Sequence, residues 1–124
     1  MPPHGTANKW AMVLNFAVRN RPGEHWVALY VDNSHGQKVV EYYDSLGDAL
    51  PKTRMVGRTV AAIVPPDYTL HEVATQHQTD DYMCGVYACY YILARASGLP
   101  MDMFKKKIVT HNEIKAFRKA SLLE

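Results

Sequence analysis

Residues 24–43 (EHWVALYVDNSHGQKVVEYY) contain the pattern that decides the fold. Residues 26–31 are rich in aromatic and β-branched side chains, which is typical of a buried β-strand. Turn-forming residues follow at positions 32–36, and residues 37–43 have the character of a returning strand. Two such segments joined by a short polar loop predict an antiparallel hairpin, so this part of the chain is expected to form a sheet.

The chain on either side of the hairpin predicts two further strands and four helices. A mostly apolar run precedes the hairpin, and Pro22-Gly23 marks the turn between them. In chain order, the expected elements are strands at 9–18, 26–31 and 37–43, a helix at 52–64, a strand at 68–73, and helices from 84 to before Gly98, at 101–109 and at 113–122. This order predicts an α+β domain with a small, mostly antiparallel sheet flanked by helices.

The composition describes one small soluble domain. The 124 residues are 48% hydrophobic and 21% charged, and the net charge of +2 is too small to make nucleic acid the main partner. No apolar run approaches the roughly 18 residues of a membrane span, and residues 1–9 lack the apolar segment of a secretory signal. We therefore expect a single domain over residues 1–124, with its core at about 10–98 and C-terminal helices at about 101–122. We expect it in the cytoplasm or nucleus of a host cell or within a virion, not secreted and without a membrane partner.

Cys84 is the candidate nucleophile. It follows a polar loop and opens a helix, where the macrodipole and unpaired N–H groups favour the thiolate. Gly85 would let a substrate carbonyl approach the backbone closely. Cys89 would face about 140° away on the same helix, which argues against a disulfide between the two. Cys89 lies on the apolar face of that helix and is the better candidate for a core thiol. For Cys84 alone, burial as a small hydrophobic residue is the plainer interpretation.

His25 and Asp44 are the candidates for a base and its partner. His25 lies at the junction of a loop and a strand, where a rigid sheet can hold a functional side chain, and Trp26 can shield the imidazole from water. Asp44 follows the returning strand, so the hairpin brings both residues to the same end of the sheet. A carboxylate there fixes the imidazole tautomer and stabilises the imidazolium. The alternatives are a surface histidine and an aspartate that only starts a turn.

Three amide side chains are candidates for an oxyanion donor. Gln78 lies six residues before Cys84, and its amide together with the Cys84 N–H would form an oxyanion hole. Gln76 and Asn15 compete for this role. For any one of the three, a solvated surface position is the alternative.

Three segments resemble a superfamily of cysteine proteases, the one that includes the SUMO and ubiquitin-like-protein proteases and the adenovirus-type maturation proteases. They are residues 23–28 (GEHWVA), 43–47 (YDSLG) and 78–87 (QTDDYMCGVY), and the order His, Asp, Cys also matches. The resemblance covers about residues 15–91 and implies the adenovirus-protease-like fold, with the catalytic cysteine at the start of a central helix. It implies His25 as base, Asp44 as third triad member, Cys84 as nucleophile, Gln78 as oxyanion donor and Trp26 at the substrate channel, with no cofactor or metal.

The resemblance also implies the substrate. The relatives cleave protein segments with small residues such as Gly before the cut. The Tyr-Asp-Ser-Leu-Gly motif and the short hairpin look more like viral and virophage-like members, which favours cleavage of polyprotein or structural-protein precursors during maturation. Met83 stands where the SUMO proteases usually have Asp, so the substrate preference need not be theirs. The alternative is an isopeptidase that acts on ubiquitin or SUMO conjugates.

Other hypotheses come from other classes of protein. The same triad serves acetyl transfer in some bacterial effectors, and a catalytically inactive module could bind a ubiquitin-like tail or a capsid peptide. A zinc site from His71, His77, Cys84 and Cys89 is disfavoured, because spacings of six, seven and five match no common zinc pattern. The basic residues 105–107 are most simply a solvated helix face, although adenovirus-type relatives use DNA as an activator, which leaves a nucleic acid open as a weak activator of this chain.

Overall fold

The computed structural model describes residues 9–17, 24–34, 36–51, 55–80 and 82–121. Its elements are β1 (Lys9–Ala17), β2 (Glu24–Asp32), β3 (Val39–Tyr43), α1 (Met55–Ile63), β4 (Thr69–Val73), α2 (Cys84–Ala96), α3 (Met101–Lys106) and α4 (His111–Ser121). The order of strands and helices is the one that the sequence predicts. The turn expected at Pro22-Gly23 and the first residues of the helix expected at 52–64 lie outside the described residues.

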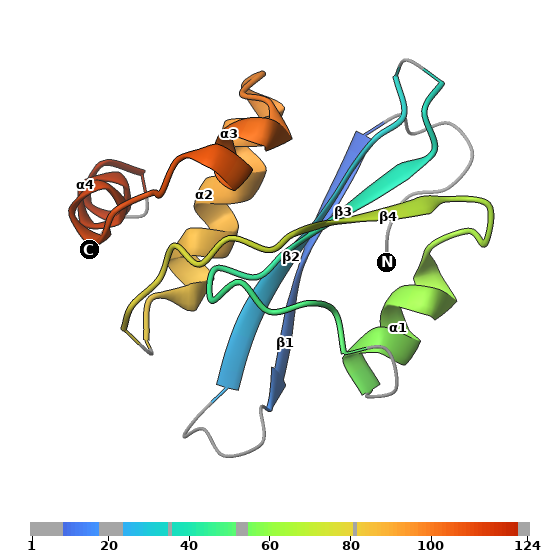
Figure 1. The fold of residues 1–124 in the computed structure, drawn as a ribbon, viewed down its shortest axis with the longest axis horizontal. Helices are drawn as coiled ribbons and strands as arrows, with labels where there is room; N and C mark the ends of the chain where they lie inside the picture. Colours follow the sequence, from blue (N-terminus) through green and yellow to red (C-terminus); the bar gives the residue numbers. More distant parts are fainter. Residues whose placement is uncertain (1–8, 18–23, 35, 52–54, 81, 122–124) are drawn as a thin grey trace.

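The four strands form one twisted sheet in the order β1-β2-β3-β4 (Figure 1). The first three strands are antiparallel, and Ala28 of β2 lies opposite Tyr43 of β3. β4 runs parallel to β3, because α1 lies in the connection that carries the chain back across the sheet. The predicted α+β class with a mostly antiparallel sheet is confirmed.

Helices cover both faces of the sheet. Side chains of a strand point alternately to one face and the other, and β2 has apolar side chains on both faces that the helices bury. On one face, Val27 and Leu29 of β2 belong to a buried cluster with Val56 and Val60 of α1. On the other face, Ala28 and Tyr30 of β2 belong to a second cluster with Tyr87, Ala88 and Tyr91 of α2. Figure 1 shows α1 on one side of the sheet and α2, α3 and α4 on the other.

A buried ion pair joins α2 to the middle of the sheet. Arg95 of α2 donates to Glu41 of β3 twice, from Nε to Oε1 at 2.8 Å and from Nη2 to Oε2 at 2.6 Å. The Tyr91 hydroxyl also donates to Glu41 Oε1, at 2.5 Å. The Glu41 carboxylate, 5% exposed, is therefore held by three charge-assisted hydrogen bonds. These contacts fix the position of α2 on the sheet, and with it the position of Cys84 at the start of the helix.

The two C-terminal helices have different limits from those expected. The helix expected at 101–109 ends at Lys106, because the Val109 N–H donates to Nδ1 of buried His77 at 2.8 Å instead of continuing the helix. The helix expected at 113–122 begins at His111. Glu113 N donates to Thr110 Oγ1 at 3.2 Å and Thr110 N donates to Glu113 Oε1 at 2.9 Å, which is a capping box.

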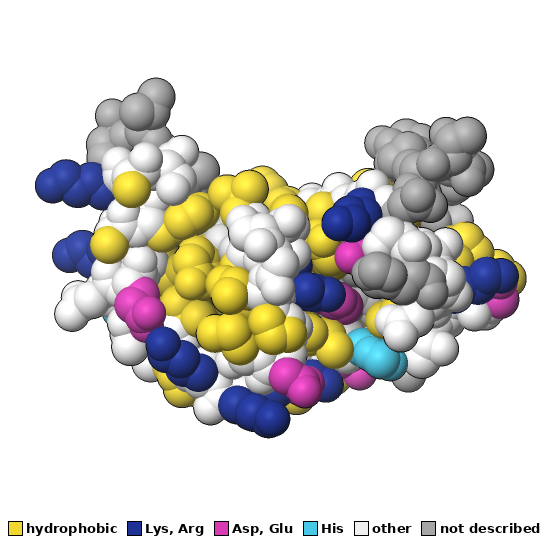
Figure 2. Space-filling model, turned by 90° about the horizontal axis from the view of Figure 1, so that it is seen from above, with side chains coloured by type: hydrophobic (Ala, Val, Ile, Leu, Met, Phe, Trp, Pro, Cys, Tyr) yellow, Lys and Arg dark blue, Asp and Glu magenta, His cyan; other side chains and the backbone are white. Residues whose placement is uncertain are grey.

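One face of the molecule gathers hydrophobic side chains across its middle, with Lys and Arg side chains toward the margin (Figure 2). The exposed large hydrophobic residues in and beside α2 and α3 include Leu93, Leu99 and Met103. Within the part of the chain that the structure describes, no helix has the length and apolar character to cross a membrane.

Candidate active site

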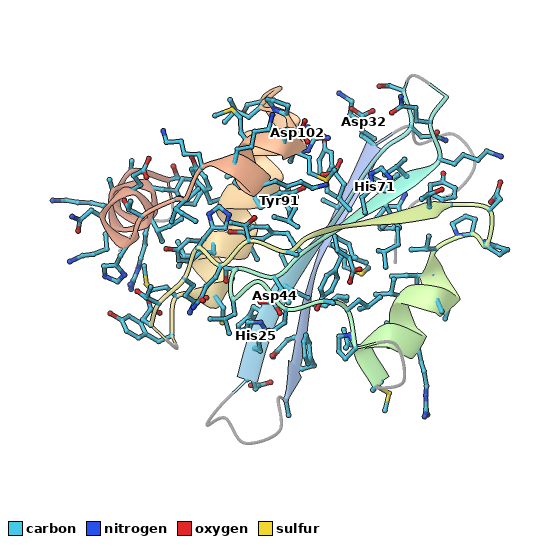
Figure 3. All side chains as sticks on the ribbon, in the orientation of Figure 1. His25, Asp32, Asp44, His71, Tyr91 and Asp102 are labelled. Carbon is cyan, nitrogen blue, oxygen red and sulfur yellow. The ribbon has the colours of Figure 1, made fainter. Side chains whose placement is uncertain are left out.

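The structure brings His25 and Asp44 into direct contact. The last residue pair between β2 and β3 is Ala28 with Tyr43, so the start of β2 extends beyond the end of β3. His25 lies on this extension, and Asp44 follows β3 directly. Nε2 of His25 donates to Oδ1 of Asp44 at 2.8 Å, with the two residues 6% and 2% exposed. Figure 3 shows the two side chains together at this end of the sheet.

A tight turn holds the Asp44 carboxylate in place. Oδ1 of Asp44 also accepts the Leu46 N–H at 2.9 Å, and the Asp44 carbonyl accepts the Gly47 N–H at 2.8 Å. Gly47 has a φ of +84°, in the left-handed region that favours glycine. A Cβ at this position would also lie 3.0 Å from the backbone nitrogen of Gln76. A turn with glycine at position 47 therefore holds the Asp44 carboxylate where it meets His25.

Cys84 lies at the first position of α2 and is 4% exposed. Burial acts to raise the pKa of its thiol, but a hydrogen bond with His25, hydrogen bonds with the backbone of Trp26 and Gly85, and the charge of His25 outweigh burial. The net pKa shift is downward. The environment thus favours the thiolate, as expected for a sulfur at a helix N-terminus.

His25 shows the complementary shift. Burial acts to lower its pKa, whereas hydrogen bonds to Asp44 and Cys84 and the negative charges of both groups raise it, with the result that the pKa of His25 is about 9. Nε2 is occupied by Asp44, so Nδ1 is the ring nitrogen left for the sulfur. The Phe16 ring from β1 packs edge-on against the imidazole, with the ring centroids 5.5 Å apart. The two opposite pKa shifts both favour an imidazolium beside a thiolate over a neutral imidazole beside a thiol.

Gln78 is fully buried beside the same turn, and its side-chain amide is engaged. The Ser45 hydroxyl donates to Gln78 Oε1 at 2.6 Å. Nε2 of Gln78 lies 3.0 Å from both the backbone oxygen and Oδ1 of Asp80. The amide therefore lies in the loop that leads to Cys84, with its oxygen held by Ser45 and both contacts of its Nε2 made to Asp80. Gln76, the competing candidate, donates from Nε2 to the Gln78 carbonyl at 2.9 Å.

Asn15 is committed elsewhere. It is exposed on β1 opposite Trp26, and its Nδ2 donates to Oε1 of Glu24 on β2 at 2.5 Å. This contact joins the β1 and β2 strands. It occupies the amide donor that the sequence offered as an alternative for the oxyanion.

Trp26 and Gly85 form part of an open apolar groove next to Cys84. Trp26 is 39% exposed, and a Cβ placed on Gly85 would lie 3.6 Å from its ring. Val13, Tyr82, Val86 and Cys89 complete the lining of the groove. Trp26 therefore lies over the start of α2 and beside open space. Cys89 is half-buried, and burial raises the pKa of its thiol, which fits a packing role.

The residues of the disfavoured zinc hypothesis are not brought together. Nε2 of His77 donates to the Phe104 carbonyl at 2.7 Å and Nδ1 accepts the Val109 N–H, so both ring nitrogens are used structurally. Among the described residues, no three His, Cys, Asp or Glu side chains are arranged to hold a metal ion. The basic residues 105–107 lie at the C-terminal end of α3 and are exposed, as expected of a solvated face.

Sequence reasoning missed Ser45 and Asp80. The backbone carbonyl of Ser45 accepts hydrogen bonds from the N–H groups of His77 and Gln78 at 2.8 and 2.9 Å. The turn that carries Asp44 therefore also holds the loop before Cys84. Asp80 holds the side chain of Gln78. The available signal for Ser45 was its place between Asp44 and the required Gly47; Asp80 had no comparable signal in a polar loop.

Comparisons with known proteins agree with the resemblance in the sequence. The model of the Ulp1 protease family, C-terminal catalytic domain, matches residues 12–124. Cysteine protease S273R of African swine fever virus (isolate Tick/Malawi/Lil 20-1/1983) is 29% identical over 116 residues, which are 90% of this chain and 42% of that protein. Putative thiol protease R355 of Acanthamoeba polyphaga mimivirus is 28% identical over 118 residues, 90% of this chain and 38% of that protein. The predicted likeness to viral members is confirmed.

Solved structures show the same fold. The selenomethionine crystal structure of the African swine fever virus pS273R protease has a TM-score of 0.73 at 28% identity, covering 90% of this chain and 43% of that chain. The SUMO protease Ulp1 with its catalytic cysteine oxidised to a sulfinic acid has a TM-score of 0.55 at 18% identity, covering 88% and 49%. At that identity the second likeness concerns the fold alone. The chain spans less than half the length of these viral relatives.

Proposed function

The chain belongs to the Ulp1 protease family, as its C-terminal catalytic domain, and from that premise we propose that it cleaves peptide bonds with Cys84 as nucleophile, His25 as acid and base, and Asp44 as the partner of His25. The observation that carries this proposal is the buried contact of 2.8 Å between His25 Nε2 and Asp44 Oδ1 beside Cys84. This contact accompanies opposite pKa shifts of His25 and Cys84.

The reaction is acyl transfer to sulfur. The Cys84 thiolate attacks the carbonyl carbon of the substrate, and the tetrahedral intermediate collapses when the His25 imidazolium gives its Nδ1 proton to the leaving amine. This leaves a thioester on Cys84 and a neutral His25. His25 then takes a proton from water as the water attacks the thioester, and collapse of the second intermediate releases the carboxylic acid and restores the thiolate and the imidazolium.

Two donors are proposed to hold the developing oxyanion. The first is the Cys84 backbone N–H, at the first residue of α2, where N–H groups have no partner within the helix. The second is Nε2 of Gln78, which must exchange one of its two contacts to Asp80 when the intermediate forms. One oxyanion donor typically contributes about 2.7–4 kcal/mol to the stability of the transition state.

The substrate we propose is an extended protein segment with a small residue, such as Gly, before the cleaved bond. The likeness of this chain to proteases of African swine fever virus and mimivirus supports a role in the maturation of viral precursor proteins, inside an infected cell or a virion. An isopeptidase that releases a ubiquitin-like protein is the second candidate. It is supported by relatives from African swine fever virus named SUMO-1 cysteine protease, 29% identical to this chain.

The test is a comparison of four substrates on purified protein: a SUMO-type conjugate, a ubiquitin conjugate, and Gly-X-Gly peptides with and without a following apolar residue. An electrophilic Gly-ending probe is added in parallel. We expect cleavage and a thioether at Cys84, and neither in the folded variant Cys84→Ala. Full cleavage by Cys84→Ala would overturn the proposal, and binding of the probe without a covalent bond would indicate an inactive binding module.

A further inference from the structure

The carboxylate of Asp80 accepts several hydrogen bonds close to Cys84. Its Oδ1 accepts the backbone N–H groups of Tyr82 and Met83 at 2.9 and 2.8 Å, and Nε2 of Gln78 at 3.0 Å. Its backbone oxygen lies 3.0 Å from the same Gln78 nitrogen. The Asp80 side chain is 14% exposed. A single residue thus holds the side chain of Gln78 and the backbone that leads into α2.

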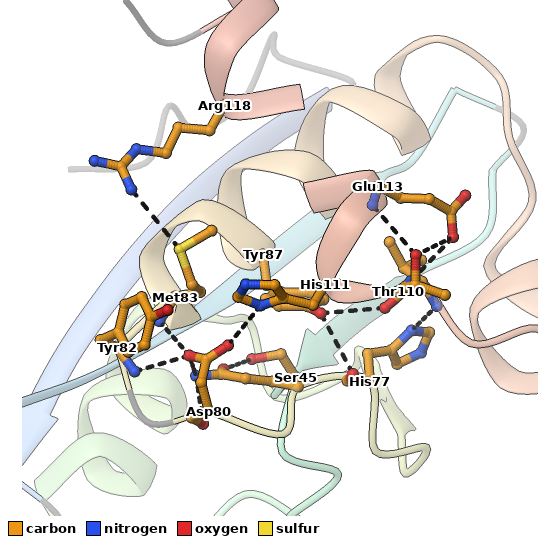
Figure 4. Close-up of polar contacts among 12 residues, drawn as sticks. Ser45, His77, Asp80, Tyr82, Met83, Tyr87, Thr110, His111, Glu113 and Arg118 are labelled. Atoms are coloured by element: carbon orange, nitrogen blue, oxygen red, sulfur yellow. Dashed lines mark hydrogen bonds and ion pairs between the residues drawn. The ribbon is translucent and has the colours of Figure 1, made fainter. Parts of the chain in front are cut away.

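The second carboxylate oxygen of Asp80 is held by the C-terminal helix. Oδ2 lies 3.1 Å from Nδ1 of His111, the first residue of α4 (Figure 4). Burial acts to raise the pKa of Asp80, but hydrogen bonds from the Tyr82 and Met83 N–H groups, from Gln78 and from His111 outweigh it, and the pKa is lowered. Asp80 is therefore an ionised acceptor at neutral pH, and His111 fixes its orientation from outside.

The start of α2 has no other side-chain cap. Met83 precedes the helix and makes no capping hydrogen bond from its side chain. The N–H groups that approach this end of the helix are satisfied by Asp80 Oδ1, as a capping residue would satisfy them. Without this acceptor, the turn of residues 82–84 would lose the contacts that set the direction of the Cys84 N–H.

We propose that Asp80 is a positioning residue for both oxyanion donors: its carboxylate orients Nε2 of Gln78 and the chain that presents the Cys84 N–H. This inference rests on the proposed peptidase function. Gln78 Nε2 carries two hydrogens, and both acceptors in the resting structure belong to Asp80. When the amide turns one hydrogen toward an oxyanion, the other keeps its contact with Asp80, so the amide pivots about a fixed point rather than moving freely.

The test is a double-mutant cycle in steady-state peptide cleavage with Asp80→Ala, Gln78→Ala and the double variant. Because Asp80 acts through the oxyanion donors, we expect Asp80→Ala to lower kcat by about 10²-fold with KM changed by less than about threefold. In the Gln78→Ala background, the same change should cost less than about tenfold. Asp80→Asn, which keeps the acceptor oxygen, should retain kcat within about tenfold of the parent. Asp102→Ala, an exposed acid in α3, is the matched control with unchanged kinetics.

An equal loss with and without Gln78, or an unchanged kcat in Asp80→Ala, would overturn the proposal. If Asp80→Ala does not fold, Asp80→Ser takes its place in the cycle, because its shorter hydroxyl can still accept a backbone N–H of the turn but replaces the carboxylate that reaches Gln78. A second measurement does not depend on turnover. The side-chain NH₂ resonances of Gln78, assigned from their absence in Gln78→Ala, should be slow to exchange in the parent and fast in the Asp80 variant. Slow exchange in both would also overturn the proposal. An inactive parent protein would refute the peptidase function and leave this measurement to decide the role of Asp80.

Discussion

Ser45 and Gln78 are joined twice: the Gln78 N–H donates to the Ser45 carbonyl at 2.9 Å, and the Ser45 hydroxyl donates to Gln78 Oε1 at 2.6 Å. Ser45 follows Asp44, and Gln78 begins the loop that ends at Cys84. The turn that orients His25, the proposed base, is therefore bound directly to the loop that carries the proposed oxyanion donor. A substitution in the turn of Asp44 is therefore expected to alter the position of Gln78 as well.

Ser45→Ala tests this connection. The change leaves the buried Gln78 Oε1 without its hydroxyl donor, so we expect a loss of about 1–3 kcal/mol in the free energy of unfolding, measured by urea denaturation. We also expect a lower kcat. Ser97→Ala is the matched control, because the Ser97 hydroxyl donates to the Leu93 carbonyl at 2.7 Å on an exposed surface. Equal effects of the two changes would contradict the prediction.

Asp44→Asn should move the basic limb of the pH–rate profile. Burial lowers the pKa of His25, but the contacts to Asp44 and Cys84 raise it to about 9, so kcat/KM in the parent should fall as the pH rises through about 9. Asn removes the charge of Asp44, and the limb should shift toward the ordinary histidine pKa of about 6.5. The profile is measured with a peptide substrate across pH 5–10, a range that brackets both values. A basic limb at the same pH in both proteins would refute the assignment.

His77 should make the fold sensitive to mild acid. Burial lowers the pKa of His77, although the Phe104 carbonyl acts in the other direction. A histidine with a lowered folded-state pKa contributes stability above its unfolded pKa of about 6.5, and this contribution is lost as the pH falls below that value. Over the same range the contribution of His25, whose pKa is raised, stays complete, since it is lost only as the pH rises from about 6.5 to about 9.

The measurement for His77 is the urea midpoint between pH 7.5 and 5, in the parent and in His77→Leu. Leu removes the acceptor of the Val109 N–H, so the variant should be less stable at every pH. It should also lose the part of the decline below about pH 6.5 that comes from His77. An identical pH dependence in the two proteins would mean that His77 does not titrate with folding.

Gly47→Ala should destabilise the folded protein more than Gly36→Ala does. Both glycines have positive φ, +84° and +76°, so alanine at either position costs about 1–2 kcal/mol in backbone strain. A Cβ on Gly36 meets open space, whereas a Cβ on Gly47 would lie 3.0 Å from the Gln76 backbone nitrogen. The difference between the two variants in thermal unfolding isolates this clash. Only the Gly47 variant should also lower kcat, because its turn holds Asp44.

The sequence predicts the parts of this molecule that depend on local patterns. The hairpin of β2 and β3 has strand periodicity and a short polar loop, and it is enough to bring His25 near Asp44. Cys84 at the start of α2 follows from a change in residue character after a polar loop. These three residues lie together in the structure, as the sequence and the resemblance led us to expect.

The remaining features depend on contacts between distant segments. Thr110 and Glu113 do carry a local capping signal, and its neglect misplaced the start of α4. The end of α3, by contrast, is set by His77, 32 residues before Val109. The engagement of the Gln78 amide by Asp80 depends on the course of an irregular loop, for which residue periodicity gives no information.

The short sequence separation between His25 and Asp44, 19 residues within one hairpin, has a consequence for how the protein becomes reactive during synthesis. Local hairpins form in about 1–10 μs, whereas pairing that closes a long stretch of chain comes later. His25 and Asp44 can therefore meet before α2 packs on the sheet. Until α2 packs, Cys84 is not held next to His25, so the contact that lowers the pKa of its thiol is absent. On the proposed mechanism, an unfinished chain is therefore expected to be inactive as a protease until α2 has packed on the sheet.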